Sequence, residues 1–375
     1  MSLTELSKLP TESQFHGIGE LTSVRTVRPP QSAASPPLVS VVIPCYNYAD
    51  YLPGAVTSAL RQSGVRTEVI IVDDCSTDSS LTVARELAAR DSNVHVFHHE
   101  VNRGPVETFN DGLAVATGEF LVRLDADDLL TPGSLSRAVA VLATYDSVGL
   151  VYGHPLHFSG VLPPARTKMR AVTLWPGTEW LARRCRDGLN VITSPEVVMR
   201  ASVVDEVGGQ QPLAHTHDME MWMRIAAFSD VAYVHGCDQA WHREHEESLS
   251  ARKVDSLVDL AERRLAFDTL FTGIARDIPR VADLQVAADR SLDRASIAAA
   301  RNEADRGEVP AERLELYFAN IRSTSAKTRA EVESLRRRAG RAPRPGELPG
   351  AGWRRLAHKI HYERSFHKWH RRGEF

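Results

Sequence analysis

The feature that most restricts the fold of this chain is an alternation of short β-branched runs with segments of helical periodicity. A further helix is expected after residue 131, with Thr131 as its N-cap and Pro132 in its first turn. Strands that alternate with helices favour a mainly parallel sheet that is covered by helices on both faces. The sequence therefore predicts an α/β fold. The strands are predicted at 39–43, 69–72, 94–97, 120–124 and 150–152, and the helices between them at 51–60, 81–89 and 106–116.

Changes in composition divide the chain into segments. The first segment ends in residues rich in Pro, Ser and Ala, and a later one contains three prolines and four glycines, so both are predicted to lack regular structure. After about residue 252 the periodicity is helical. In chain order we predict a flexible leader at 1–37, one domain at 38–250 with halves at 38–153 and 154–250, a helical extension at 251–338, a linker at 339–352 and a basic amphipathic tail at 353–375.

Charge and cysteine content exclude several classes of protein. The net charge is -3, so the molecule as a whole is not expected to bind nucleic acid. The four cysteines are widely spaced and form no CxxC pair, which argues against a zinc site or a disulfide framework. The sequence contains no signal-peptide pattern and no run of about 20 apolar residues. We therefore expect a cytoplasmic protein.

Polar side chains follow four of the predicted strands, where each strand ends. Ligands of open α/β sheets bind beyond the carboxyl ends of the strands, so these side chains are expected to gather at one edge. Such an edge has the groups that a nucleotide diphosphate needs. In chain order the residues are Pro44, Tyr46 and Asn47, then Asp73 and Asp74, then Arg103, and then Asp125, Asp127 and Asp128.

Each of these motifs has a structural alternative when it is taken alone. Asp125 and Asp127 are hard oxygen ligands that suit Mg²⁺ or Mn²⁺, but a solvated acidic loop has the same composition. Asp74 could accept a hydrogen bond from a nucleobase or could form an Asx turn. Arg103 could pair with a diphosphate or could be a surface arginine.

Two further candidates lie in the second half. Asp218 stands at the start of a segment with an apolar helical face, where an aspartate is either a helix cap or a general base. His245 lies in the stretch from Trp241 to Ser250 and is either a structural histidine or a metal ligand.

Taken together, the motifs resemble those of the inverting glycosyltransferase family 2, whose members have the nucleotide-binding, Rossmann-like GT-A fold. The resemblance covers about residues 38–250 and keeps the family's motif order and spacing. One departure is His217, which stands where the family usually has an acidic residue. The motifs are VSVVIPCYNYADYLPGAVTSALRQS, EVIIVDDCSTDSS, NRGPVETFNDGLAVATGEFLVRLDADDLLTP, HDMEMWMR and HREHEESLS.

The resemblance implies a role for each motif and divides the domain into a nucleotide-sugar half (38–153) and an acceptor half (154–250). It implies that Asp218 is the catalytic base and that the cofactor is Mn²⁺ or Mg²⁺. An inverting transfer then needs one base for the acceptor hydroxyl and one metal for the leaving diphosphate. The implied nucleotide-sugar ligands are Pro44, Tyr46, Asn47, Asp74, Arg103 and Asp125, and the implied metal ligands are Asp127, Asp125 and His245.

The expected reaction is transfer of a sugar from a nucleotide-diphosphate sugar, with UDP as the nucleotide we expect, to a hydroxyl acceptor in polysaccharide or glycoconjugate synthesis. Two alternatives are a nucleotidyltransferase acting on sugar phosphates and a non-catalytic nucleotide-sugar-binding module. A nicotinamide dehydrogenase is excluded because no G-x-G-x-x-G follows the first strand. The basic, aromatic residues of 353–372 predict either peripheral contact with an anionic membrane, which suits a lipid-linked acceptor, or packing and oligomerisation.

Overall fold

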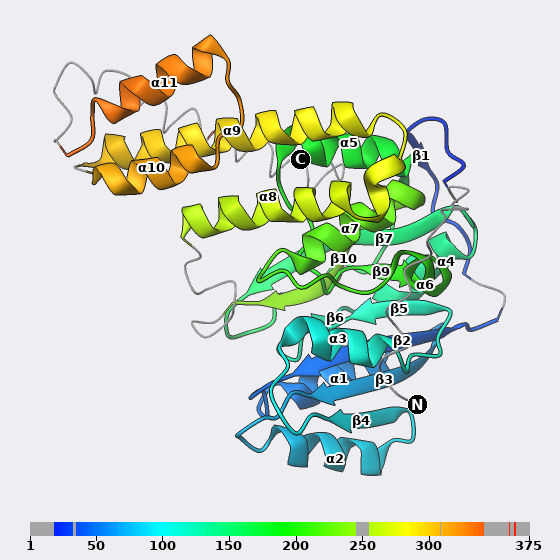
Figure 1. The fold of residues 1–375 in the computed structure, drawn as a ribbon. Helices are drawn as coiled ribbons and strands as arrows, with labels where there is room; N and C mark the ends of the chain where they lie inside the picture. Colours follow the sequence, from blue (N-terminus) through cyan, green and yellow to red (C-terminus); the bar gives the residue numbers. More distant parts are fainter. Residues whose placement is uncertain are drawn as a thin grey trace.

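The computed structural model describes residues 19–32, 35–244, 255–307 and 309–340, together with Ile360 and Arg364. Over these residues the chain forms one ten-stranded sheet with helices on both faces and further helices at one end (Figure 1). The predicted α/β class is confirmed.

The first half of the domain is the predicted parallel part of the sheet. Its strands are β2 (Leu38–Cys45), β3 (Arg66–Asp73), β4 (Val94–His98) and β5 (Phe120–Arg123), and the helices between them are α1 (Leu52–Leu60), α2 (Ser80–Arg90) and α3 (Pro105–Leu113). Strand β2 lies parallel between β3 and β5, and β4 lies parallel beside β3. The carboxyl ends of all four strands therefore reach the same edge of the sheet.

The second half mixes parallel and antiparallel pairs. Strand β9 pairs antiparallel with both β5 and β7 and so joins the two halves, while β10 lies parallel to β7 and antiparallel to β8. The strand order is β1-β8-β10-β7-β9-β5-β2-β3-β4, with β6 on β10. The elements are β1 (Arg25–Val27), β6 (Leu129–Leu130), α4 (Ser134–Leu142), β7 (Val148–Phe158), β8 (Ala171–Trp175), α5 (Gly177–Asp187), β9 (Val198–Arg200), α6 (Ala201–Val207), α7 (His217–Phe228) and β10 (Asp230–Arg243).

Successive residues of β2 enter separate cores on the two faces of the sheet. Val42 packs with Phe109 of α3 in a core that also contains residues of α5 and α7, whereas Val41 packs on the other face with Leu52 of α1. This is the period-two alternation of a strand covered on both faces. Gly112 of α3 lies so close to the sheet that an added Cβ would stand 2.3 Å from Cγ1 of Val42. A glycine is therefore needed there for α3 to approach the sheet.

Part of the predicted leader belongs to the sheet. Residues 25–27 form strand β1, which pairs antiparallel with β8 and brings Thr26 opposite Thr173. The backbone N–H groups of Glu20 and Leu21 also donate to the carboxylate of Asp230. The sheet thus begins well before residue 38. A three-residue edge strand is too short for a period-two pattern to reveal in the sequence.

Helix α4 begins later than the sequence predicts. Its first residue is Ser134, and the preceding Gly133 adopts the left-handed conformation, with φ of 73°. Thr131 is not the N-cap. Its hydroxyl instead donates to the backbone carbonyl of Asp238 in β10, so that a tertiary contact replaces the expected local one.

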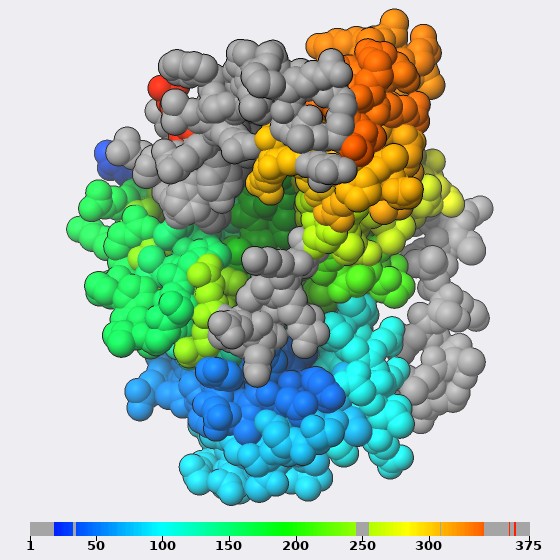
Figure 2. All heavy atoms as spheres, turned by 90° about the vertical axis from the view of Figure 1, so that its left-hand side faces the viewer, coloured from blue at the N-terminus to red at the C-terminus, as the bar shows by residue number. Residues whose placement is uncertain are grey.

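The helical extension shares its core with the domain at one end. Its elements are α8 (Ser256–Thr272), η2 (Ile274–Asp277), α9 (Val281–Arg306), α10 (Ala311–Ala319) and α11 (Ala326–Arg336). Phe267 of α8 and Leu292 of α9 belong to the core that contains α5 and α7. Farther along α9, Ile297 packs with Leu314 of α10 and Leu335 of α11 in a separate core. Figure 2 shows these last helices, in orange, at the opposite end of the molecule from the parallel half, in blue and cyan.

Two predicted features lie outside the described residues: His245 with the segment that follows it, and nearly all of the basic tail at 353–375. Among the helices of the described part of the chain, none has the length and apolar character that crossing a bilayer requires.

Candidate active site

A cavity of about 520 Å³ opens at the carboxyl edge of the parallel strands. Its walls come from the segments that follow β2, β3, β4 and β5, together with the end of β10. Six predicted site residues line it, namely Pro44, Tyr46, Asn47, Asp74, Asp125 and Asp127. The convergence expected from the strand order is therefore present, and β10 adds a wall from the second half of the chain.

The acidic loop after β5 directs two of its three carboxylates to the cavity and one away from it. Asp125 and Asp127 line the cavity. Asp128 faces away, since it is 1 % exposed and its carboxylate accepts from His242 Nδ1 at 3.0 Å and from the backbone N–H of Arg243 at 2.8 Å. Burial and the charges of Asp127 and Asp125 raise the pKa of Tyr48, whose ring forms part of the same wall. The cavity therefore has a concentrated negative charge at this point.

Positive groups face these carboxylates from two strands. Arg123, the last residue of β5, is buried and pairs with Asp125 at 3.0 Å. Arg243 at the end of β10 donates to the backbone carbonyl of Asp127 at 2.9 Å. Burial lowers the pKa of His242, but the hydrogen bond and charge of Asp128 outweigh it and raise the pKa to about 9. The cavity thus has cations beside its carboxylates, as a site for a phosphorylated ligand requires.

Asp74 supports the rim of the cavity through hydrogen bonds that its carboxylate accepts. The backbone N–H groups of Arg103 and Gly104 donate to it at 2.7 and 2.8 Å, and His99 Nδ1 lies 2.8 Å from the same oxygen as Arg103. Gly104 has φ of 84°, a conformation that favours glycine, and it precedes α3 directly. The loop after β4 is thus held against the end of β3.

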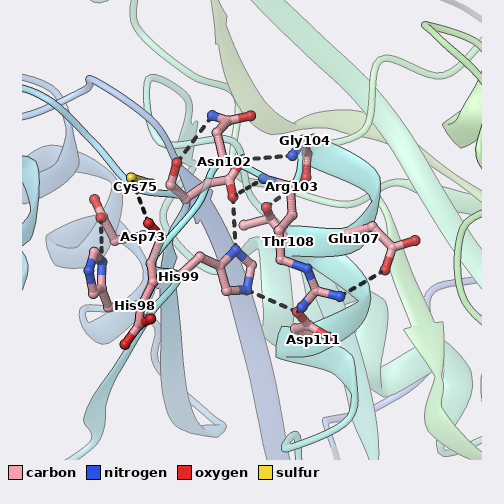
Figure 3. Close-up of polar contacts among 12 residues, drawn as sticks. Asp73, Cys75, His98, His99, Asn102, Arg103, Gly104, Glu107, Thr108 and Asp111 are labelled. Atoms are coloured by element: carbon pink, nitrogen blue, oxygen red, sulfur yellow. Dashed lines mark hydrogen bonds and ion pairs between the residues drawn. The ribbon is translucent and has the colours of Figure 1, made fainter. Parts of the chain in front are cut away.

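Two predicted ligands make contacts other than those expected. The guanidinium of Arg103 does not line the cavity but lies against Asp111 and Glu107 of α3, as Figure 3 shows. Asn47 lines the cavity, but its side-chain oxygen accepts from the backbone N–H groups of Thr77 and Asp78 and so joins the loops after β2 and β3. Arg123 and Arg243 occupy the cavity where Arg103 was predicted.

Asp218 lies at the start of α7, in its first turn rather than at its cap, which is Thr216. Its carboxylate accepts from the side chains of Asn190 and Ser194, each at 3.3 Å, and from the backbone N–H of Met219. Ser194 has φ of 98°, an unusual value for a non-glycine residue. The carboxylate is thereby oriented by a loop that lies next to it in space.

His217, the departure from the family's motif, is neutral in this setting. Its side chain is buried, and this burial, followed by the positive charge of Arg123, lowers its pKa to about 4. The charges of Asp218 and Asp125 oppose the shift but are smaller. The substitution of histidine for an acidic residue therefore adds no positive charge beside Asp218 at neutral pH.

The described residues contain no group of three or more acidic, His or Cys side chains arranged to hold a metal. Asp125 and Asp127 supply two carboxylates on one wall, and Asp128 is committed to His242. Two carboxylates fit a Mg²⁺ or Mn²⁺ ion whose remaining ligands are substrate phosphates and water. Side chains on this wall thus suit a metal that arrives with its substrate.

The geometry agrees with what the sequence shares with known proteins. Residues 40–208 match the sequence model of the family described as glycosyl transferase family 2. Residues 40–208 are thus similar to glycosyl transferase family 2 in sequence. The matched stretch contains the whole parallel half and ends at α6, before Asp218 and β10.

Curated relatives match parts of the chain. An uncharacterized glycosyltransferase of Haemophilus influenzae is 24% identical over 236 residues, which is 58% of this chain and 72% of the relative. A putative teichuronic acid biosynthesis glycosyltransferase of Bacillus subtilis, TuaG, is 42% identical over 24% of this chain and 36% of its own length. The succinoglycan biosynthesis protein ExoO of Rhizobium meliloti is 41% identical over 28% of this chain and 29% of its own length. The matches thus span about a third of the last two relatives.

Solved structures share the fold. A crystal structure of residues 1–349 of S. aureus TarS in complex with UDP-GlcNAc superposes with a TM-score of 0.55 at 19% identity, over 80% of this chain and 90% of that one. The likeness extends beyond the family 2 match into the helices that follow it.

Several cavity residues of this domain were missed by sequence reasoning. Arg123 can be identified from the sequence, because an arginine inside the apolar run FLVRL needs a charged or polar partner when the strand is buried. His242 and Arg243 are the first two residues of the motif HREHEESLS, in which His245 is the predicted ligand. No periodicity singles these two residues out, and the pairing of β10 with β6 and β7 brings both of them to the cavity.

Proposed function

We propose that this protein transfers a sugar, with inversion, from a nucleotide-diphosphate sugar to a hydroxyl acceptor. The observation that carries the proposal is the cavity in which Asp125 and Asp127 stand beside Arg123 and Arg243 at the strand ends. A diphosphate needs cationic donors, and a metal that accompanies it needs carboxylates. Both sets of groups line one cavity here.

The hydrogen-bond capacity of Asp74 supports a uridine nucleotide. Within the described part of the chain, one of its carboxylate oxygens already faces two donors, whereas the other accepts only from the Gly104 N–H. A carboxylate oxygen has two lone pairs, so one acceptor position remains on the second oxygen. Uracil presents a single ring N–H, which fits that position, while guanine presents two adjacent donors. UDP-sugars are therefore the donors we propose.

The proposed acceptor base is Asp218. Its carboxylate is held by Asn190 and Ser194 and lies at the positive end of α7. It would accept the proton of the acceptor hydroxyl as that oxygen attacks the anomeric carbon. The leaving nucleoside diphosphate is a weak base, so no protein acid is needed to protonate it. Relatives named for teichuronic acid and succinoglycan biosynthesis support a polysaccharide or glycoconjugate acceptor.

The test of this function is release of UDP from a panel of UDP-sugars, with water in place of the acceptor. In the Asp218→Asn variant the amide keeps the shape of the carboxylate without its basicity. We expect turnover to fall at least about 100-fold, the usual scale for a general base, with little change in the Kd of UDP. Asp205→Asn, on the exposed face of α6, is the matched control and should keep the wild-type rate.

Three kinds of outcome would contradict the proposal. Unchanged turnover in Asp218→Asn, or a loss confined to UDP affinity, would make Asp218 a binding or structural residue. Release of pyrophosphate from a nucleoside triphosphate and a sugar phosphate would instead identify a nucleotidyltransferase. A protein that binds UDP-sugars but releases no UDP under any of these conditions would be a binding module.

The proposed cofactor is Mn²⁺ or Mg²⁺, with Asp125 and Asp127 as its protein ligands. When bound, the metal offsets the charge that develops on the leaving diphosphate. We expect UDP to bind wild-type protein more tightly with Mn²⁺ than with a chelator, and Asp127→Ala to bind it with the same low affinity in both. Turnover should be lost in this variant. Asp146→Ala, an exposed aspartate before β7, is the control. A metal response that survives in Asp127→Ala would show that the ligands lie elsewhere.

A further inference from the structure

Four charged or ionisable side chains contact one another between the end of β3 and helix α3. They belong to Asp74, His99, Arg103 and Asp111. His99 directly follows β4 and is mostly buried, with 11% of its side chain exposed. Its Nδ1 lies 2.8 Å from the carboxylate of Asp74, and its Nε2 lies 2.9 Å from the carboxylate of Asp111 in α3. Arg103 contacts the same oxygen of Asp111 (Figure 3). The imidazole therefore connects a cavity residue with helix α3.

The contact with His99 determines how Asp74 can meet a ligand. The imidazole and the backbone N–H of Arg103 share one carboxylate oxygen, and the N–H of Gly104 uses the other. The two backbone donors stand at the end of the loop after β4, whereas the imidazole comes from the first residue of that loop and is a side-chain contact to the carboxylate. Asp111, held by Arg103, in turn fixes the ring of His99. The orientation of Asp74 thus depends on α3 through His99.

We propose that His99 is a positioning residue for nucleotide binding, because it holds Asp74 in the orientation that leaves one acceptor position open to the cavity. This inference rests on the proposed function, since it assigns Asp74 to the nucleobase. His99 itself is not among the residues that line the cavity. Its effect is therefore on nucleotide affinity and not on the rate of the chemical step.

A pair of amide variants tests the inference. The side-chain nitrogen of Asn can take about the place of Nδ1, and that of Gln about the place of Nε2. His99→Asn therefore keeps the donor to Asp74, whereas His99→Gln keeps only the donor to Asp111. We expect the Kd of UDP, measured by calorimetry, to rise about tenfold in His99→Gln, the scale of one hydrogen bond to a charged group. In His99→Asn it should rise less than about threefold, and the turnover of either variant at saturating UDP-sugar should stay near the wild-type value.

The neighbouring residue supplies a matched control. His98 Nδ1 lies 3.1 Å from Asp73, which does not line the cavity, so His98→Gln should leave the Kd of UDP unchanged. Equal UDP affinity in His99→Gln and the wild type would overturn the inference. So would equal losses in His99→Asn and His99→Gln that follow their melting temperatures, because this is the behaviour of a purely structural residue. Wild-type protein that binds no UDP would overturn both this inference and the proposed donor, whereas binding that is insensitive to His99 would overturn this inference alone.

Discussion

Glu196 is a buried acid in the loop before β9, and its environment predicts a pH dependence of stability. Its carboxylate accepts from the backbone N–H and the hydroxyl of Thr193. Burial raises its pKa from 4.5 to about 7, and these hydrogen bonds only partly oppose the shift. A carboxyl whose pKa is raised by folding favours the folded state while it is protonated. That contribution is complete below about pH 4.5 and is lost as the pH rises toward 7.

Glu196→Gln removes this ionisation while keeping an acceptor for Thr193. The free energy of unfolding of the variant, relative to the wild type, should therefore increase between pH 4.5 and 7 by up to about 3 kcal/mol and then level off. Denaturant unfolding at a series of pH values measures the difference. Glu206→Gln, an exposed acid on α6, should show a flat difference across the same range. A flat difference for Glu196→Gln as well would mean that the carboxyl titrates normally.

Helix α9 is the element that ties the helical extension to the catalytic domain. It has 26 residues, and Leu292 lies in the core shared with α5 and α7, whereas Ile297 lies in the separate core with α10 and α11. A helix of this length passes from one core into the other without a break in its hydrogen bonding. Its N-terminal half therefore belongs with the domain in packing, although the sequence predicts one extension.

Two leucine truncations distinguish the cores. Leu292→Ala and Leu314→Ala each remove a side chain that is 1% exposed and should each cost about 2–5 kcal/mol locally. Hydrogen exchange should quicken in α10 and α11 for Leu314→Ala, and in α5 and α7 for Leu292→Ala. The Kd of UDP should change in neither variant while the protein is folded. Faster exchange throughout the protein in Leu314→Ala would show that the two cores unfold as one unit.

At the scale of the whole molecule, the cavity depends on the antiparallel strand β9, which separates two groups of parallel strands within one sheet. Strand β9 is antiparallel to its neighbours β5 and β7, so a second parallel pair, β7 and β10, lies beyond it. This arrangement carries His242 and Arg243 at the end of β10 to the acidic loop after β5. The cavity at the end of the parallel half is thereby completed by residues more than a hundred positions away in the chain.

The sequence by itself determined the parallel half and the main carboxylates of the cavity. Val39 to Ile43 and the runs at 69–72 and 120–124 are buried on both faces, so their apolar composition marks them as strands without reference to the rest of the chain. Strands of one parallel sheet end at one edge, so Asp74, Asp125 and Asp127 had to lie close together. The family resemblance added Asp218, whose spacing alone fits a cap as well as a base.

Only the tertiary structure decided which polar groups face the cavity and which support it. Arg103 is a predicted ligand of the nucleotide, yet its guanidinium pairs with Asp111, and Asp128, the last acid of the loop after β5, pairs with His242. Arg123 and Arg243 line the cavity instead of Arg103 because β5 and β10 end there. A side chain's charge and spacing are local properties, whereas its partner depends on elements that meet only after folding. For the same reason β1 was missed, since its pairing with β8 and not its own three residues makes it a strand.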